Sequence, residues 1–223
     1  MEILKPLILI PIKDFSETKS RIKAAIPVRY SPFIDRLVEL TFFRTIDTIK
    51  TFSCPFGVIS PSISVINESK KLGATFTYRD SGIDLNVALS EAVQELPLDQ
   101  ALLIILPDLP FISQVFFHEL IDETDKYDML IVPSISSDKN LGTAALYLKK
   151  RNLISFQFGR NSCERYQAEA RKTNLKFRLL TFDPFARDLD TLNDVKYLKQ
   201  HLKSIIKPEP FIKVLEQLDI KSL

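Results

Sequence analysis

The chain contains no tryptophan and few of the residues that build several common kinds of site, with five glycines, two cysteines and two histidines in 223 residues. The glycines are scattered, which excludes a glycine-rich phosphate loop of the Walker or dinucleotide-binding kind. Cys54 and Cys163 lie far apart without metal-ligand spacing, so we expect a reducing compartment and no disulfide framework. His118 and His201 fall in separate helical stretches, and we place neither in catalysis.

Net charge and long apolar runs are also scarce. The formal net charge of +2 gives no electrostatic reason to expect binding to nucleic acid or to a membrane surface. No apolar run approaches the length of a membrane-spanning helix, and the N-terminus runs into a predicted strand without a secretory leader. We therefore expect a cytoplasmic protein.

Hydrophobic residues make up 45% of the chain, which is enough for the core of one α/β domain. We assign residues 1–207 to this domain. Prolines at positions 208 and 210 break the last predicted helix of the domain. Residues 208–223 are therefore expected to form a short, amphipathic C-terminal extension.

Short apolar segments alternate with amphipathic ones along the chain. Residues 7–12 and 102–106 are apolar throughout, which is typical of strands buried on both faces. A helical period follows over 31–49, where Ser31 is expected as N-cap and Pro32 as the first helical residue. This alternation predicts a mostly parallel central sheet with helices on both faces. The other expected strands are 56–60, 75–78, 128–133, 143–148 and 177–182. The other expected helices are 65–72, 85–96, one capped by Ser113, 162–172, and 191–206, where Thr191 and Asp194 have the spacing of a capping box.

Three aspartates stand where strands are expected to end. Asp108 follows a proline that stops a buried strand, and Asp188 and Asp190 form an Asp-x-Asp pair just before a predicted helix. Ligands bind at this edge of open α/β sheets, and a few carboxylates together with waters and substrate phosphates suit Mg²⁺. We predict a magnesium site at these residues. The alternative is that Asp108 caps a turn and the Asp-x-Asp pair only caps a helix.

Cations follow the first strand. Lys13, Lys19 and Arg21 occupy a polar loop and would compensate the charge of a polyphosphate, although most loops of this composition are simply solvated. Backbone N–H groups at a helix start such as Ser162 would hold a terminal phosphate. Gly159 just before it is suited to a positive φ.

Six short motifs occur in order between residues 7 and 202: Pro11-x-Lys13 with Lys19-Ser20-Arg21, Arg79-Asp80-x-Gly82-x-Asp84-Leu85-Asn86-x-Ala88-Leu89, Asp108-Leu109-Pro110, Gly142-Thr143, Phe158-Gly159-x-x-Ser162, and Asp188-x-Asp190-Thr191. This pattern resembles the 2-phospho-L-lactate guanylyltransferases, which include the phosphoenolpyruvate guanylyltransferases of deazaflavin coenzyme F-420 biosynthesis.

The resemblance implies a single-domain nucleotidyltransferase of the GT-A type that depends on Mg²⁺, uses GTP as donor and takes a small phosphorylated three-carbon acid as acceptor. It also suggests a homodimer. The implied roles are metal binding for Asp108, Asp188 and Asp190, triphosphate contacts for Lys13, Lys19 and Arg21, nucleoside contacts for Arg79, Asp80, Gly82, Asp84 and Asn86, and acceptor contacts for Thr143, Gly159 and Ser162.

The chain departs from the family pattern at two positions of the expected acceptor pocket. Ala144 stands where the family usually has asparagine, and Asn161 stands where it often has glycine. The acceptor therefore stays open between phospholactate, phosphoenolpyruvate and phosphoglycerate. Two alternatives also stay open: another magnesium-dependent nucleotidyl- or sugar transferase on the same scaffold, and a non-catalytic nucleotide-binding protein.

Overall fold

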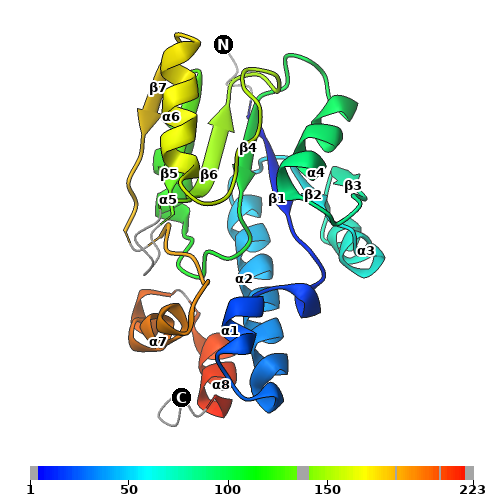
Figure 1. The fold of residues 1–223 in the computed structure, drawn as a ribbon, viewed down its shortest axis with the longest axis vertical. Coiled ribbons are helices and arrows are strands. Elements are labelled where there is room, and N and C mark those ends of the chain that lie inside the picture. Colours follow the sequence, from blue (N-terminus) through cyan, green and yellow to red (C-terminus); the bar gives the residue numbers. More distant parts are fainter. Residues whose placement is uncertain (1–4, 135–140, 184, 206, 219–223) are drawn as a thin grey trace.

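A seven-stranded sheet forms the centre of the molecule, with its strands in the order β3-β2-β1-β4-β6-β5-β7 (Figure 1). The computed structural model describes residues 5–134, 141–183, 185–205 and 207–218. Every strand runs in the same direction except β6, which is antiparallel to both β4 and β5. The predicted α/β class is confirmed, with a mixed sheet. The strands are β1 (Leu7–Pro11), β2 (Phe56–Ile59), β3 (Phe76–Tyr78), β4 (Leu102–Ile105), β5 (Met129–Pro133), β6 (Thr143–Leu148) and β7 (Phe177–Leu179).

The central strands are apolar at every position because helices cover both faces of the sheet. In β1, Ile8 and Ile10 belong to one buried cluster, and Leu7 and Leu9 belong to another on the opposite face. This is the alternation expected of a strand between two layers. The first face is covered by α2 (Ser31–Lys50), α3 (Ile63–Lys71) and α5 (Gln114–Ile121), and the second by α4 (Leu85–Ala92) and α6 (Ser162–Lys172).

A third buried cluster lies beyond the sheet, in the lower part of Figure 1. It contains Ile22, Leu37, Phe111 and Phe211, each at most 3% exposed. The C-terminal extension therefore folds back onto the first half of α2 as an additional helix. Besides α2, the helices that contribute to this cluster include α1 (Ser20–Ala24), α7 (Leu192–Gln200) and α8 (Glu209–Gln217). The 3-10 helices within the described residues are Phe15–Glu17, Val28–Tyr30, Val93–Glu95 and Leu202–Ser204.

The helix starts show where local prediction succeeds and where it is wrong. Ser113 caps α5 by accepting from the Phe116 N–H group, and Thr191 caps α7, as predicted. Ser31 is not an N-cap, because a 3-10 turn leads straight into α2 and the Ser31 N–H group already donates to the Val28 carbonyl. That bond satisfies a donor which a cap would otherwise have to satisfy.

Several predicted boundaries differ from the structure; the helix predicted over 85–96, for example, ends at Ala92. The polar loop after β1 contains a 3-10 turn and α1, because Asp14 accepts from the Ser16 N–H group and Ile22 is fully buried. Strand β7 ends at Leu179, and α7 ends at Gln200. The predicted helix end at position 206, most of the loop at 134–141 and the last residues of the extension lie outside the described residues. Within the described residues, no helix is both long and apolar enough to cross a membrane.

Replacing Phe211 in α8 with alanine is expected to lower the free energy of unfolding by about 3–5 kcal/mol, because it leaves a cavity in the third cluster. Urea-induced unfolding measures the change. The matched control is Val28→Ala, at a side chain that is 84% exposed, which should change stability by less than about 0.5 kcal/mol. An unchanged urea midpoint for Phe211→Ala would contradict the packing of α8 on the domain.

Candidate active site

Two distant segments meet at the carboxyl edge of the sheet. Asp108 follows β4, and the Leu189 N–H group, between the other two aspartates, donates to the Asp108 carbonyl at 3.0 Å. Asp194 Oδ2 accepts from the N–H groups of Asp190 at 3.3 Å and Thr191 at 2.7 Å, which fixes the second segment. The Asp-x-Asp segment therefore precedes a capping box and also brings its carboxylates to Asp108.

The segments that carry Lys19, Asp108 and the Asp-x-Asp pair all pack into the third hydrophobic cluster. Ile22, Phe111 and Leu189 all belong to the third cluster and are at most 1% exposed. Each lies within three residues of one of the charged groups of the site. The packing of this cluster therefore fixes the spacing of the charges above it.

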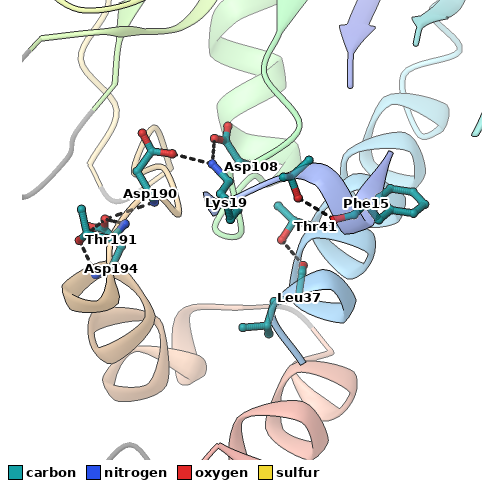
Figure 2. A network of polar contacts seen from close by, with 9 residues as sticks. Phe15, Lys19, Leu37, Thr41, Asp108, Asp190, Thr191 and Asp194 are labelled. Atoms are coloured by element: carbon teal, nitrogen blue, oxygen red, sulfur yellow. Dashed lines mark hydrogen bonds and ion pairs between the residues drawn. The ribbon is translucent and has the colours of Figure 1, made fainter. Parts of the chain in front are cut away.

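Lys19 bridges two of the aspartates (Figure 2). It lies just before α1 with a left-handed backbone conformation, φ +55°, and its side chain is 10% exposed. Its Nζ donates to Asp108 Oδ2 and, at 2.6 Å, to Asp190 Oδ1. Burial by itself would lower the pKa of Lys19, but the two carboxylates outweigh burial and raise that pKa above its ordinary value.

Asp188 completes the acidic group and has the least favourable environment in it. The side chain is buried, and burial followed by the nearness of Asp108 and Asp190 raises the pKa of Asp188 well above its ordinary value. The buried Oδ1 atoms of Asp108 and Asp188 have no hydrogen-bond partner within the described residues. Unsatisfied, mutually repelling carboxylate oxygens are the type of donor that a divalent cation prefers.

The carboxylate oxygens of these aspartates do not surround one common metal position in this structure. Within the described residues, no group of three carboxylate, histidine or cysteine side chains has an arrangement that would hold a metal ion. The Lys19 ammonium group supplies the positive charge between Asp108 and Asp190 (Figure 2). A cation bound by all three aspartates would therefore compete with Lys19 for the carboxylates of Asp108 and Asp190.

Two cavities open beside this charged group, and Lys19, Leu85 and Leu106 line both of them. The larger has a volume of about 640 Å³ and the smaller about 250 Å³. The larger is also lined by Ser20, Arg21, Ser134, Gly142, Thr143, Phe158, Gly159, Arg160, Asp188 and Asp190, and the smaller by Pro11, Ile12, Lys13, Thr18, Val38, Asp80, Gly82, Asp84, Ala88, Pro107 and Asp108.

The three predicted acceptor residues are divided between the surface of the larger cavity and the layer beneath it. Thr143 and Gly159 line the cavity. Ser162 is fully buried, and its hydroxyl oxygen lies 2.8 Å from Thr143 Oγ1. The Ser162 N–H group donates to the Gly159 carbonyl, and the next N–H group, that of Cys163, donates to the Leu141 carbonyl. In this structure the Ser162 N–H group is therefore already paired within the chain, and its role in holding a phosphate stays a prediction.

Some of the predicted nucleoside residues line the smaller cavity and others do not. Asp80, Gly82 and Asp84 line the smaller cavity together with Lys13. Arg79 is exposed, lines neither cavity, and donates through Nε to the Pro61 carbonyl at 3.4 Å. Asn86 also lines neither cavity. The structure thus brings three of the five residues to the cavity surface.

The two departures from the family pattern have structural explanations. Ala144 is fully buried in the core on the α2 face and does not line either cavity. Asn161 has φ +56°, a left-handed conformation that asparagine adopts more readily than most residues and glycine adopts freely. Neither residue lines the larger cavity.

Ser134, Gly142 and Arg160 are among the residues of the larger cavity to which sequence reasoning gave no role. Ser134 directly follows β5, so the rule that placed Asp108 at a strand end would also have found it. Gly142 approaches it so closely that an added Cβ would lie 2.7 Å from Ser134 Oγ. Arg160 stands next to Gly159 in the motif, and its position in the sequence gave no sign that it lines the cavity.

Residues 6–213 of this chain match the model of the family described as "Guanylyl transferase CofC like". A 2-phospho-L-lactate guanylyltransferase from Methanocaldococcus vulcanius is 25% identical over 209 residues, which cover 90% of each chain. A phosphoenolpyruvate guanylyltransferase from Chloroflexus aggregans is 27% identical over 201 residues, which cover 87% of this chain and 95% of the relative.

Solved structures share the fold at lower identity. A protein named for nucleotide-diphospho-sugar transfer from Desulfovibrio desulfuricans G20 superposes with a TM-score of 0.74 at 15% identity, over 95% of this chain and 97% of that one. A nucleotidyl transferase from Methanothermobacter thermautotroptrophicus gives 0.58 at 12% identity, over 87% and 97%. The predicted nucleotidyltransferase fold is confirmed.

Replacing Lys19 with methionine is expected to lower the free energy of unfolding by about 3–5 kcal/mol in the presence of a chelator, because it leaves buried carboxylates without a counter-charge. Added Mg²⁺ should stabilise this variant more than the unchanged protein, since the cation no longer competes with an ammonium group. Chemical unfolding with and without Mg²⁺ measures both effects.

The control for Lys19→Met is Lys71→Met, which removes an exposed ion pair with Glu68. This change should alter stability by no more than about 0.5 kcal/mol. If Lys19→Met were as stable as the unchanged protein, the ammonium group would not be the counter-charge of the site.

Proposed function

Because the chain belongs to the CofC-like guanylyl transferase family, we propose that it transfers GMP from GTP to a small phosphorylated three-carbon acid and releases pyrophosphate. The names of its relatives point to 2-phospho-L-lactate or phosphoenolpyruvate as the acceptor, and thus to a step of deazaflavin coenzyme F-420 biosynthesis. The observation that carries the proposal is the pair of adjoining cavities that share Lys19 beside three carboxylates.

The smaller cavity is the proposed nucleotide side, and the larger is the acceptor side. In the reaction, an oxygen of the acceptor phosphate forms a bond to the α-phosphorus of GTP. The bond from that phosphorus to the oxygen bridging to the β-phosphorus breaks, and pyrophosphate leaves with the electron pair. The attacking oxygen is already anionic, so no side chain has to act as a general base.

The protein's contribution is to bring two anions together and to hold them in line. Lys19 reaches both cavities, Lys13 lines the nucleotide side, and Arg21 and Arg160 line the acceptor side. Fixed positive charges next to developing negative charge are worth more in a partly buried site than in water. Binding both substrates in adjoining cavities also removes the entropic cost of their encounter.

The residues proposed to hold Mg²⁺ are Asp108, Asp188 and Asp190. Two of them carry the unsatisfied buried oxygens described above, and phosphate oxygens and waters would complete the coordination. When bound, the cation would neutralise phosphate charge near the reacting phosphorus. Lys19, released from these carboxylates, would be free to donate to a phosphate group.

Asp108→Asn is expected to lower the turnover number at least about 100-fold while leaving the fold intact, because it removes a charged ligand that acts on the transition state. Transfer is measured as pyrophosphate release with GTP, ATP, CTP and UTP. Mass spectrometry then identifies the product formed with each of the three candidate acceptors.

The matched control is Asp99→Asn, at an exposed aspartate of the loop before β4; this variant should retain normal turnover. Near-normal turnover of Asp108→Asn with Mg²⁺ would contradict the role of the carboxylate. An unchanged protein that releases no pyrophosphate from GTP with any of the acceptors would contradict the proposed function.

A further inference from the structure

The wall of the larger cavity includes an irregular segment that needs side chains to hold its backbone. Phe158, Gly159 and Arg160 line the cavity and lie between β6 and α6, outside regular secondary structure. From the α6 side, Tyr166 Oη accepts from the Gln157 N–H group at 2.7 Å, and Arg165 donates to the Gln157 carbonyl at 2.6 Å. Buried or partly buried backbone groups of this kind require such partners.

The next residue of the segment is held by a different helix, α4. The Phe158 N–H group donates to Asn86 Oδ1 at 2.6 Å, and Asn86 Nδ2 donates to the Phe158 carbonyl at 3.1 Å. One side-chain amide thus pairs with both polar groups of one backbone residue, as a neighbouring strand would. Asn86 is 72 residues away from Phe158 in the sequence, so only the fold brings them together.

Asn86 stands in the first turn of α4, between the two cavities. Asp84, which caps this helix by accepting from the Asn86 and Val87 N–H groups, lines the smaller cavity. Leu85 lines both cavities, whereas Asn86 itself lines neither. The amide of Asn86 therefore joins the start of α4, on the nucleotide side, to the wall of the acceptor side.

We propose that Asn86 is a positioning residue for acceptor binding, which acts by holding the Phe158–Arg160 wall against α4 and does not contact the nucleotide. The assignment of the two cavities to acceptor and nucleotide rests on the proposed function. The two hydrogen bonds between Asn86 and Phe158, which we call the clamp, do not depend on that assignment. Loss of the clamp loosens the acceptor wall and leaves the lining of the smaller cavity in place.

The test compares Asn86→Ala with Ser90→Ala. Ser90 is the matched control because it lies one turn further along α4, is exposed, and its hydroxyl group donates to the Asn86 carbonyl at 2.7 Å. In Asn86→Ala, amide hydrogen exchange at Phe158 is expected to accelerate at least about tenfold, since its acceptor is gone. The KM for the phosphorylated acid should rise about tenfold, and the affinity for GTP with Mg²⁺ should change less than about twofold. Ser90→Ala should leave all three unchanged.

Two results would overturn the inference. One is unchanged exchange at Phe158 in Asn86→Ala, which would show that the amide does not hold the wall. The other is a loss of GTP affinity of tenfold or more with unchanged acceptor KM, which would make Asn86 a nucleotide ligand. If Asn86→Ala does not fold, Asn86→Asp replaces it, because it keeps an acceptor for the Phe158 N–H group, and a smaller shift in the same two quantities is expected.

The hydrogen-exchange measurement needs neither substrate. If the unchanged protein transfers no GMP, the proposed function fails, but the exchange rate at Phe158 still decides whether the clamp exists. If transfer occurs and the exchange rate at Phe158 does not change in Asn86→Ala, the role of Asn86 is rejected and the proposed function stands.

Discussion

One buried ammonium group balances the charge on which the candidate active site is built. Lys19 donates to Asp108 and Asp190, and Asp188 lies against both acids in a place where burial and repulsion disfavour its charged form. Like charges at this density need a counter-cation. In this structure the Lys19 ammonium group is that cation. In the proposed chemistry, a metal ion binds the carboxylates in place of Lys19, and Lys19 donates to the polyphosphate.

The charges hold their spacing because apolar neighbours are packed beneath them. Ile22, Phe111 and Leu189 come from the three segments that carry Lys19, Asp108 and the Asp-x-Asp pair, and they meet in one cluster. Helix α8 completes that cluster with Phe211 and other buried side chains. Helix α8 of the C-terminal extension, which is far from the first strand in sequence, therefore packs in the same cluster as the residues next to the charged groups of the site.

The strands and most helices could be predicted because their signals are local. Fully apolar segments of strand length, the Thr191–Asp194 capping box and the Ser113 cap are each contained in a few consecutive residues. The start of α2 could not be predicted in this way, because a 3-10 turn took the role that a capping serine would have had. Helix α1 was missed for a related reason: it is short, and the burial of Ile22 in the third cluster determines it more than any helical period does.

The sequence by itself determined which residue types stand at strand ends, and the order of its motifs indicated the family that the family model then showed. Only the tertiary structure decided what each of those residues touches. It joined Lys19 to two acids about 90 and 170 positions away, placed Ser162 beneath the cavity surface, and turned Asn86 toward the backbone of Phe158. The physical reason is that hydrogen bonds and ion pairs depend on distances of a few ångströms between groups remote in sequence, and packing of the whole chain sets those distances.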